Sequence, residues 1–194
     1  MGQRCDFAAL AVTDRARAAY AWMAPMDERL GVRHLERIAL GTPYTLVAQR
    51  VQEVVWKLDG NCVVAVDATG LGAPVVDMLK EARLPCELSA VVITGGERAN
   101  TSGGVWHVPK RDLIGGLQIL LEKGELRIAK GLREAGSLVR ELVDMRGTRR
   151  ASGRVRLGAD GAGEHDDLVM ATALACWVAE RPTNGFGVRR LPGI

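Results

Sequence analysis

Two adjacent aspartates, Asp166 and Asp167, follow His165 and stand directly before an apolar run that is typical of a buried helix. One interpretation is helix capping, because carboxylates at a helix N-terminus accept hydrogen bonds from backbone N–H groups and interact favourably with the helix macrodipole. The other is metal binding, in which the pair and a third carboxylate from elsewhere hold a divalent cation. The stretch by itself leaves both interpretations open.

A third carboxylate, Asp67, directly follows the short apolar run of residues 62–66. Such a run predicts a strand buried on both faces in a parallel sheet, and open α/β sheets bind their ligands at the carboxyl ends of the strands. Asp67 is therefore a candidate ligand. An aspartate at this place also suits a turn, in which it accepts a hydrogen bond from the backbone of Thr69 or Gly70.

Asp67, Asp166 and Asp167 would repel one another strongly at one spot unless cations neutralised them. Two Mg2+ or Mn2+ ions bound to these aspartates would do so, and they would polarise a phosphodiester for in-line attack by water. Carboxylate oxygens are the ligands that these hard ions prefer. In this hypothesis His165 orients a ligand or assists the leaving group; otherwise it is a surface histidine.

Basic residues form a second candidate site. Between residues 146 and 156, glycines and an Arg-Val-Arg alternation predict a hairpin or an extended flap that carries five arginines: Arg146, Arg149, Arg150, Arg154 and Arg156. Such arginines bind DNA phosphates without reading the sequence, or they belong to a solvated loop. Lys110 follows Pro109 at a predicted helix start, where a cation opposes the helix dipole. It either binds a nearby phosphate or extends its charge into water.

The turn Gly70-Leu71-Gly72 after the strand allows a nucleotide-binding interpretation, but the signal is weak. Residue 75 is a valine, so the G-x-G-x-x-G motif is incomplete, and the chain contains no G-x-x-x-x-G-K-[ST] motif. A cofactor-binding α/β domain that uses this turn stays open as a different class of function.

The 194 residues, 47% of them apolar, suit one domain with a full core and exclude wholesale disorder. No apolar run reaches the roughly 18 residues of a membrane helix, and we find no signal-peptide pattern. The net charge of +3 is too small to indicate a nucleic-acid partner. Four cysteines occur without a C-x-x-C pair, so we interpret Cys5, Cys62, Cys86 and Cys176 as free thiols of a cytoplasmic protein.

Hydrophobic periodicity predicts several strands first, and then strands that alternate with helices. The predicted strands span residues 7–13, 16–23, 32–40, 62–67, 89–94, 105–108 and 125–128, the sixth of them at a sheet edge. The predicted helices span residues 43–58, 73–82, 109–121, 132–143 and 168–179. This order predicts an α/β protein with a mixed sheet flanked by helices.

Several segments together resemble the nuclease domain of tailed-phage terminase large subunits. The resemblance lies in Gly2-Gln3-Arg4-Cys5-Asp6-Phe7, Gly41-Thr42-Pro43-Tyr44, Val66-Asp67-Ala68-Thr69-Gly70, Val91-Val92-Ile93-Thr94-Gly95-Gly96, Val108-Pro109-Lys110-Arg111-Asp112 and Glu164-His165-Asp166-Asp167-Leu168. Each motif is weak alone, whereas their order and spacing are fairly specific. The resemblance covers residues 2–180, and residues 181–194 are predicted to be a loose C-terminal tail.

The resemblance implies an RNase H-like fold and a two-metal endonuclease that cuts concatemeric viral DNA during head packaging in the bacterial host cell. Asp67 matches the family's second metal-binding aspartate, and Asp166 and Asp167 match its acidic pair, with Asp167 the more direct ligand. The implied partners are double-stranded DNA, the terminase ATPase domain, the small terminase subunit and the portal protein.

The sequence departs from the family pattern at its start. The family's leading aspartate ends a first strand before a Gly-Gln-like turn, and here that turn is Gly2-Gln3. We therefore expect the first strand to be missing or truncated and the chain to be an incomplete nuclease. No Walker motif occurs, so the ATPase motor is not in this chain. The alternatives are another RNase H-like nuclease, such as a junction resolvase, and a non-catalytic remnant that binds DNA or a portal protein.

Overall fold

The structure is a computed structural model that describes residues 8–17, 28–58, 62–145, 148–149, 155–156 and 166–181. It divides into two compact units, one of Met1–Leu40 with Arg111–Ala179 and the other of Gly41–Lys110 with Glu180–Ile194. The described residues form two mixed sheets, a two-stranded ribbon and five α-helices, which confirms the predicted α/β class. The predicted domain boundary after residue 180 stays a prediction.

The sheet of the first unit contains β1 (Ala8–Arg17), β2 (Glu28–Ile38) and β7 (Leu126–Ile128). The central strand β2 pairs antiparallel with β1 and parallel with β7. Strand β2 has a bulge at Arg33, an extra residue between the partners of Val12 and Thr13 on β1. The bulge changes which alternate residues of β2 are buried: Leu30 and Val32 before it, and Leu35 after it. The predicted second strand is wrong at its start, because residues 16 and 17 still belong to β1; the rest of it lies outside the described residues.

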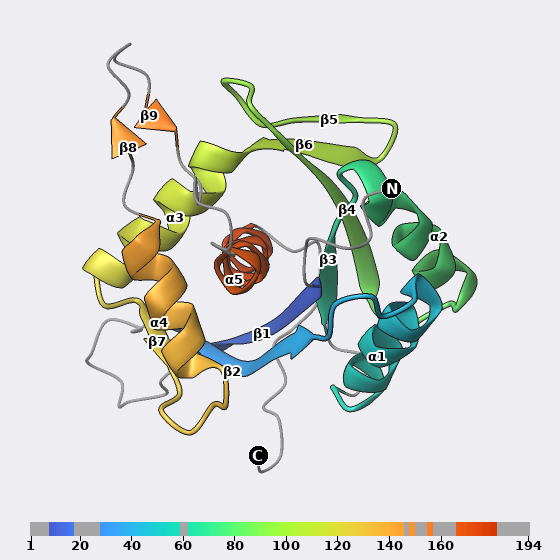
Figure 1. Ribbon diagram of the computed structural model, residues 1–194. Helices are drawn as coiled ribbons and strands as arrows, with labels where there is room; N and C mark the ends of the chain where they lie inside the picture. Colours follow the sequence, from blue (N-terminus) through green and yellow to red (C-terminus); the bar gives the residue numbers. More distant parts are fainter. Residues whose placement is uncertain are drawn as a thin grey trace. The chain divides into compact units, whose positions relative to one another are not determined.

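Three helices and the short ribbon complete the first unit. Helix α5 (Asp167–Ala179) is apolar on all sides and packs on β1 and β2, with α4 (Ala135–Asp144) against it (Figure 1). Helix α3 (Lys110–Glu122) buries Leu113, Leu117 and Leu120 along one side. Strands β8 (Thr148–Arg149) and β9 (Val155–Arg156) pair antiparallel, as expected for the predicted hairpin.

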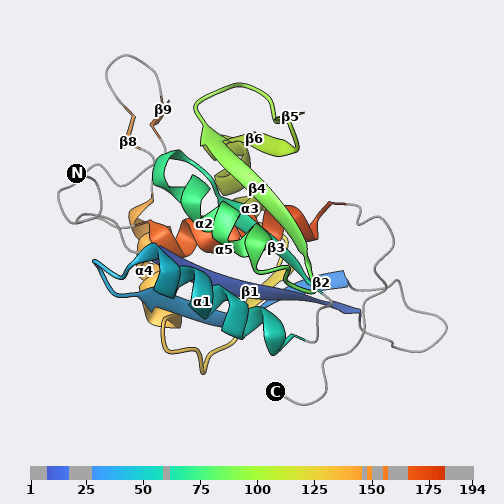
Figure 2. The ribbon, with the colours of Figure 1, turned by 90° about the vertical axis from the view of Figure 1, so that its right-hand side faces the viewer.

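The sheet of the second unit has the order β3-β4-β6-β5 (Figure 2). Strands β3 (Val63–Asp67), β4 (Glu87–Thr94) and β6 (Val105–Pro109) run parallel, and β5 (Asn100–Ser102) is antiparallel to β6. The predicted edge position of residues 105–108 is wrong, because the polar loop after β4 supplies β5 as the outer strand. At the other edge of the described sheet lies β3, whose apolar residues are half-buried and not fully buried as expected.

Helices α1 (Tyr44–Trp56) and α2 (Ala73–Glu81) pack against each other, and α2 also contacts β4. Pro43 occupies the N-cap position of α1, one residue before the first helical residue Tyr44. The 3₁₀ turn η1 (Gly70–Gly72) connects β3 to α2. None of the helices in the described part of the chain has the length and apolar character that crossing a membrane requires.

Candidate functional site

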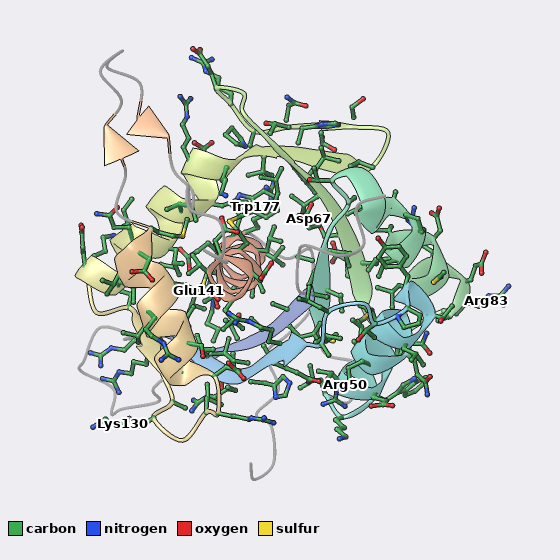
Figure 3. All side chains as sticks on the ribbon, in the orientation of Figure 1. Arg50, Asp67, Arg83, Lys130, Glu141 and Trp177 are labelled. Carbon is green, nitrogen blue, oxygen red and sulfur yellow. The ribbon has the colours of Figure 1, made fainter. Side chains whose placement is uncertain are left out.

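The first candidate residue, Asp67, is exposed at the C-terminal end of β3 (Figure 3). Its Oδ1 atom accepts a hydrogen bond of 2.8 Å from the N–H group of Thr69, which is the turn contact considered for this aspartate. Thr69 Oγ1 in turn accepts a 2.8 Å hydrogen bond from Ile93 N–H, and Ala68 N–H donates to the Val91 carbonyl at 2.7 Å. The turn is therefore tied to β4, and it fixes the carboxylate at the strand end.

Gly72 is required by close packing of this turn on β3. A Cβ atom at position 72 would lie 1.8 Å from the carbonyl oxygen of Asp67, so any other residue would displace the backbone that carries the aspartate. Gly70 has φ of +57°, a conformation that favours glycine. Backbone geometry thus accounts for both glycines, without a phosphate-binding role for the turn.

The second candidate group, Asp166 and Asp167, lies at the N-terminus of α5, and both side chains are partly exposed. Asp167 is the first helical residue, and the carbonyl oxygen of Asp166 accepts a 2.8 Å hydrogen bond from Met170 N–H. Asp166 therefore stands at the N-cap position. A capping side chain at this position normally accepts hydrogen bonds from the second and third helical N–H groups, which here belong to Leu168 and Val169.

Those two N–H groups donate instead to Glu141 of α4. The Leu168 nitrogen lies 2.9 Å and the Val169 nitrogen 3.0 Å from Glu141 Oε2. Figure 3 labels Glu141 on α4. A side chain 27 positions earlier in the chain therefore caps α5. The N–H groups that an N-cap side chain normally takes thus go to Glu141, so Asp166 and Asp167 are not needed as acceptors for Leu168 and Val169.

The Arg37 guanidinium of β2 pairs with the other oxygen of Glu141, whose residue is only 7% exposed. Burial raises the pKa of Glu141 above its ordinary value, while the Val169 N–H group and the Arg37 guanidinium oppose this rise. The Asp167 carboxylate adds to the rise. Glu141 thus connects β2, α4 and the start of α5 within the first unit, and it places negative charge beside the acidic pair.

The sequence analysis missed Glu141, although a signal for it exists. Residues 138, 141 and 145 follow the helical spacing, and Leu138, Glu141 and Met145 are all buried. A glutamate on the buried side of an amphipathic helix needs a partner, because an unpaired buried charge is costly. The partner itself was not visible in the local sequence.

The structure describes only some of the predicted basic residues. Lys110 is the first residue of α3 and is half-buried, and Asp112 in the same turn lies 3.5 Å from Arg111. The backbones of Arg149 and Arg156 lie in the paired strands β8 and β9. Three of the predicted arginines and the predicted histidine lie outside the described residues: Arg146, Arg150, Arg154 and His165.

A groove of about 550 Å³ in the second unit lies at the C-terminal end of β4 and along the β5–β6 hairpin. Its lining residues are Thr94, Gly96, Glu97, Arg98, Asn100 and His107. One acidic and one basic side chain stand side by side in the sequence there, so the lining favours neither an anion nor a cation. We assign it no ligand.

The predicted aspartates are divided between the two units, with Asp67 in the second and the pair of Asp166 and Asp167 in the first. Within the described ranges, no three or more His, Cys, Asp or Glu side chains form a group that could hold a metal ion. Their joint binding of metal therefore stays a prediction. The chemistry of the donors fits it, because all three aspartates offer the oxygen ligands that Mg2+ and Mn2+ take.

Solved structures with a similar fold include nuclease domains of phage large terminases. The large terminase nuclease from thermophilic phage G20c with bound magnesium is 23% identical, with a TM-score of 0.55 over 90% of this chain and 82% of that chain. The large terminase nuclease domain of Thermus phage P74-26 is 21% identical, with a TM-score of 0.56 over 94% and 84%. No protein-family model matches the sequence, and no curated protein matches it either.

These similarities confirm, at the level of the fold, the resemblance to terminase nuclease domains that the sequence motifs indicated.

Proposed function

We propose that this chain is a metal-dependent DNA endonuclease domain of the terminase large-subunit type. The observation that carries the proposal is the cluster of three carboxylates at the start of α5, where Glu141 accepts the Leu168 and Val169 N–H groups beside Asp166 and Asp167. The fold similarity supports the same function. The RNase H-like class of the fold and the cutting of concatemeric viral DNA are part of this proposal.

In this proposal, Asp67, Asp166 and Asp167 hold two Mg2+ or Mn2+ ions. When bound, these ions polarise the scissile phosphodiester and lower the pKa of an attacking water. The turn bond from Thr69 fixes the Asp67 carboxylate, and the contacts of Glu141 fix the backbone on which the acidic pair stands. His165 assists the leaving group or orients a ligand.

In this proposal, the basic residues bind the DNA. The antiparallel pairing of β8 and β9 gives the arginine-rich segment a ribbon that can follow a DNA backbone, and Lys110 at the start of α3 adds a cation. Contacts from arginines to phosphates position DNA without reading its sequence. The terminase ATPase domain, the small subunit and the portal protein are proposed partners of the packaging reaction.

Cleavage of supercoiled plasmid with Mn2+ or Mg2+ tests the proposal. If Asp67, Asp166 and Asp167 suffice without the family's leading aspartate, the unmodified chain gives nicked and linear products, and Asp67→Ala or Asp167→Ala gives none. Asp77→Ala is the matched control, since the Asp77 side chain is 72% exposed on α2 and its ion pair with Lys80 is long, at 3.9 Å. Equal cutting by the unmodified chain and Asp167→Ala would disprove the metal assignment.

A second candidate function is DNA binding without cleavage. The antiparallel pairing of the two arginine-bearing strands favours it. Retention of DNA in a gel-shift assay, with no cleavage under any metal condition, would support this function over the endonuclease.

A further inference from the structure

Two cysteines of the second unit, Cys62 and Cys86, are neighbours at the entry to two parallel strands. Val63 of β3 lies opposite Glu87 of β4, so the cysteines stand one position before this pair on adjacent chain segments. Glu87 N–H donates a 3.3 Å hydrogen bond to the Cys62 carbonyl oxygen, which keeps this end of the two segments in register. Both side chains are half-buried free thiols, and they hydrogen-bond to each other.

The usual spacing of paired strands, which these cysteines directly precede, is compatible with a covalent bond between the two sulfurs. Neighbouring strands lie about 4.8 Å apart, and the Cα atoms of a disulfide are usually about 4.4 to 6.8 Å apart. We propose that Cys62 and Cys86 are a redox modification site: a low-molecular-weight disulfide, such as oxidised glutathione, converts the two thiols into an intramolecular disulfide.

The reaction is a two-step thiol–disulfide exchange. The Cys86 thiolate attacks one sulfur of oxidised glutathione, which forms a mixed disulfide and releases one glutathione thiolate. The Cys62 thiolate then attacks Cys86 Sγ, which forms the protein disulfide and releases the second glutathione. Two protein thiols are oxidised, one glutathione disulfide is reduced to two thiols, and the two thiol protons go to the departing glutathiones.

The order of attack follows from the surroundings of the two sulfurs. Burial raises the pKa of Cys62 to about 11, and its S–H group donates to Cys86. Burial also raises the pKa of Cys86, but the hydrogen bond from Cys62 opposes that rise. Cys86 therefore ionises first and is the attacking residue, while Cys62 resolves the mixed disulfide.

The disulfide would close the segment that carries β3, the turn with Asp67, α2 and the start of β4. It would lie at the opposite end of β3 from Asp67, roughly 16 Å away at about 3.3 Å per residue. It therefore stabilises this segment through the unfolded state without touching the turn. The inference does not depend on the proposed nuclease function.

Peptide mapping of the whole folded chain tests the proposal. The reduced chain is equilibrated with reduced and oxidised glutathione, quenched with acid, alkylated and digested with trypsin for mass spectrometry. We expect a cross-linked pair of peptides containing Cys62 and Cys86, which dithiothreitol removes, and a thermal midpoint several degrees higher in the oxidised chain.

Single variants separate the two steps. Cys62→Ser should leave Cys86 as a mixed disulfide with glutathione, and Cys86→Ser should give no cross-link. Far-UV circular dichroism checks that both variants are folded. The proposal is overturned if both thiols of the unmodified chain remain fully alkylatable in the oxidising buffer. It is also overturned if they carry only glutathione, or are linked to Cys5 or to another chain.

Discussion

A buried carboxylate is costly unless its charge and its lone pairs are satisfied, and Glu141 meets this condition with Arg37 and two helix N–H groups. The same residue fixes the first turn of α5, where Asp166 and Asp167 stand. Glu141, which belongs to none of the sequence motifs, therefore positions the backbone of Asp166 and Asp167, which do belong to one.

Glu141→Ala should lower the free energy of unfolding by about 3 kcal/mol, because it leaves the Arg37 charge without its carboxylate and the N–H groups of α5 without an acceptor. Glu141→Gln keeps an oxygen acceptor of the same shape and should cost less. Urea unfolding followed by circular dichroism measures both. An unchanged midpoint for Glu141→Ala would mean that the contacts contribute little to stability.

Gly72→Ala should destabilise the chain by about 1 to 3 kcal/mol, because the new methyl group meets the carbonyl oxygen of Asp67 and the backbone must shift. Gly116→Ala in α3 is the matched control, since a Cβ there meets no atom within 4 Å. Alanine also favours a helix interior, so this control should stabilise by about 0.5 to 1 kcal/mol. Thermal unfolding of the two variants compares them directly. If Gly72→Ala and Gly116→Ala had the same stability, the turn would accommodate the new methyl group by a small backbone shift.

Alkaline pH should weaken the fold through Cys62. Its pKa is about 11 in the folded chain and 9.0 for an ordinary thiol, so between these values the unfolded chain has lost a proton that the folded chain keeps. The stability contribution is fully present below pH 9.0 and is lost as pH rises towards 11. Urea midpoints measured across this range check the sign, and Cys62→Ser should show a smaller loss over the same range.

At the scale of the elements, the candidate residues stand at the ends of a strand and a helix. The apolar helix α5 is buried against β1 and β2 and presents its acidic N-terminus, while β3 presents Asp67 at its C-terminal end. The strands β8 and β9 pair the backbones of Arg149 and Arg156, and in the proposed function these arginines bind DNA phosphates.

Replacing Arg149 and Arg156 of this ribbon by alanine should weaken binding to DNA of any sequence and make the affinity less dependent on salt. Each lost phosphate contact should reduce the slope of log affinity against log salt by about 1. Arg133→Ala, at an exposed position between β7 and α4, is the control. Fluorescence anisotropy at several salt concentrations measures the slopes, and an unchanged slope in the double variant would exclude the ribbon from DNA binding.

At the scale of the whole molecule, the candidate metal ligands belong to two compact units, Asp67 to one and Asp166 and Asp167 to the other. Binding of metal by all three aspartates is part of the proposed function. A ligand that binds only the folded state raises its stability, so the thermal midpoint reports metal binding.

Mn2+ should raise the thermal midpoint of the unmodified chain, and Asp67→Ala and Asp167→Ala should each remove most of the rise. If both aspartates bind the same ions, the double variant should lose little more than either single variant. Added EDTA should abolish the rise in the unmodified chain. If the losses of the two single variants in this rise add up in the double variant, the two aspartates do not share metal ions.

The sequence by itself determined the α/β class, most elements, the terminase-like order of motifs and the candidate aspartates, because these depend on local periodicity, turn residues and short motifs. Glu141 capping α5, β5 outside β6 and the division into two units depended on contacts between distant segments. No local pattern specifies which distant N–H group a buried glutamate will meet. Only the tertiary structure therefore decided that the start of α5 is capped from another helix, by Glu141 and not by its own aspartates.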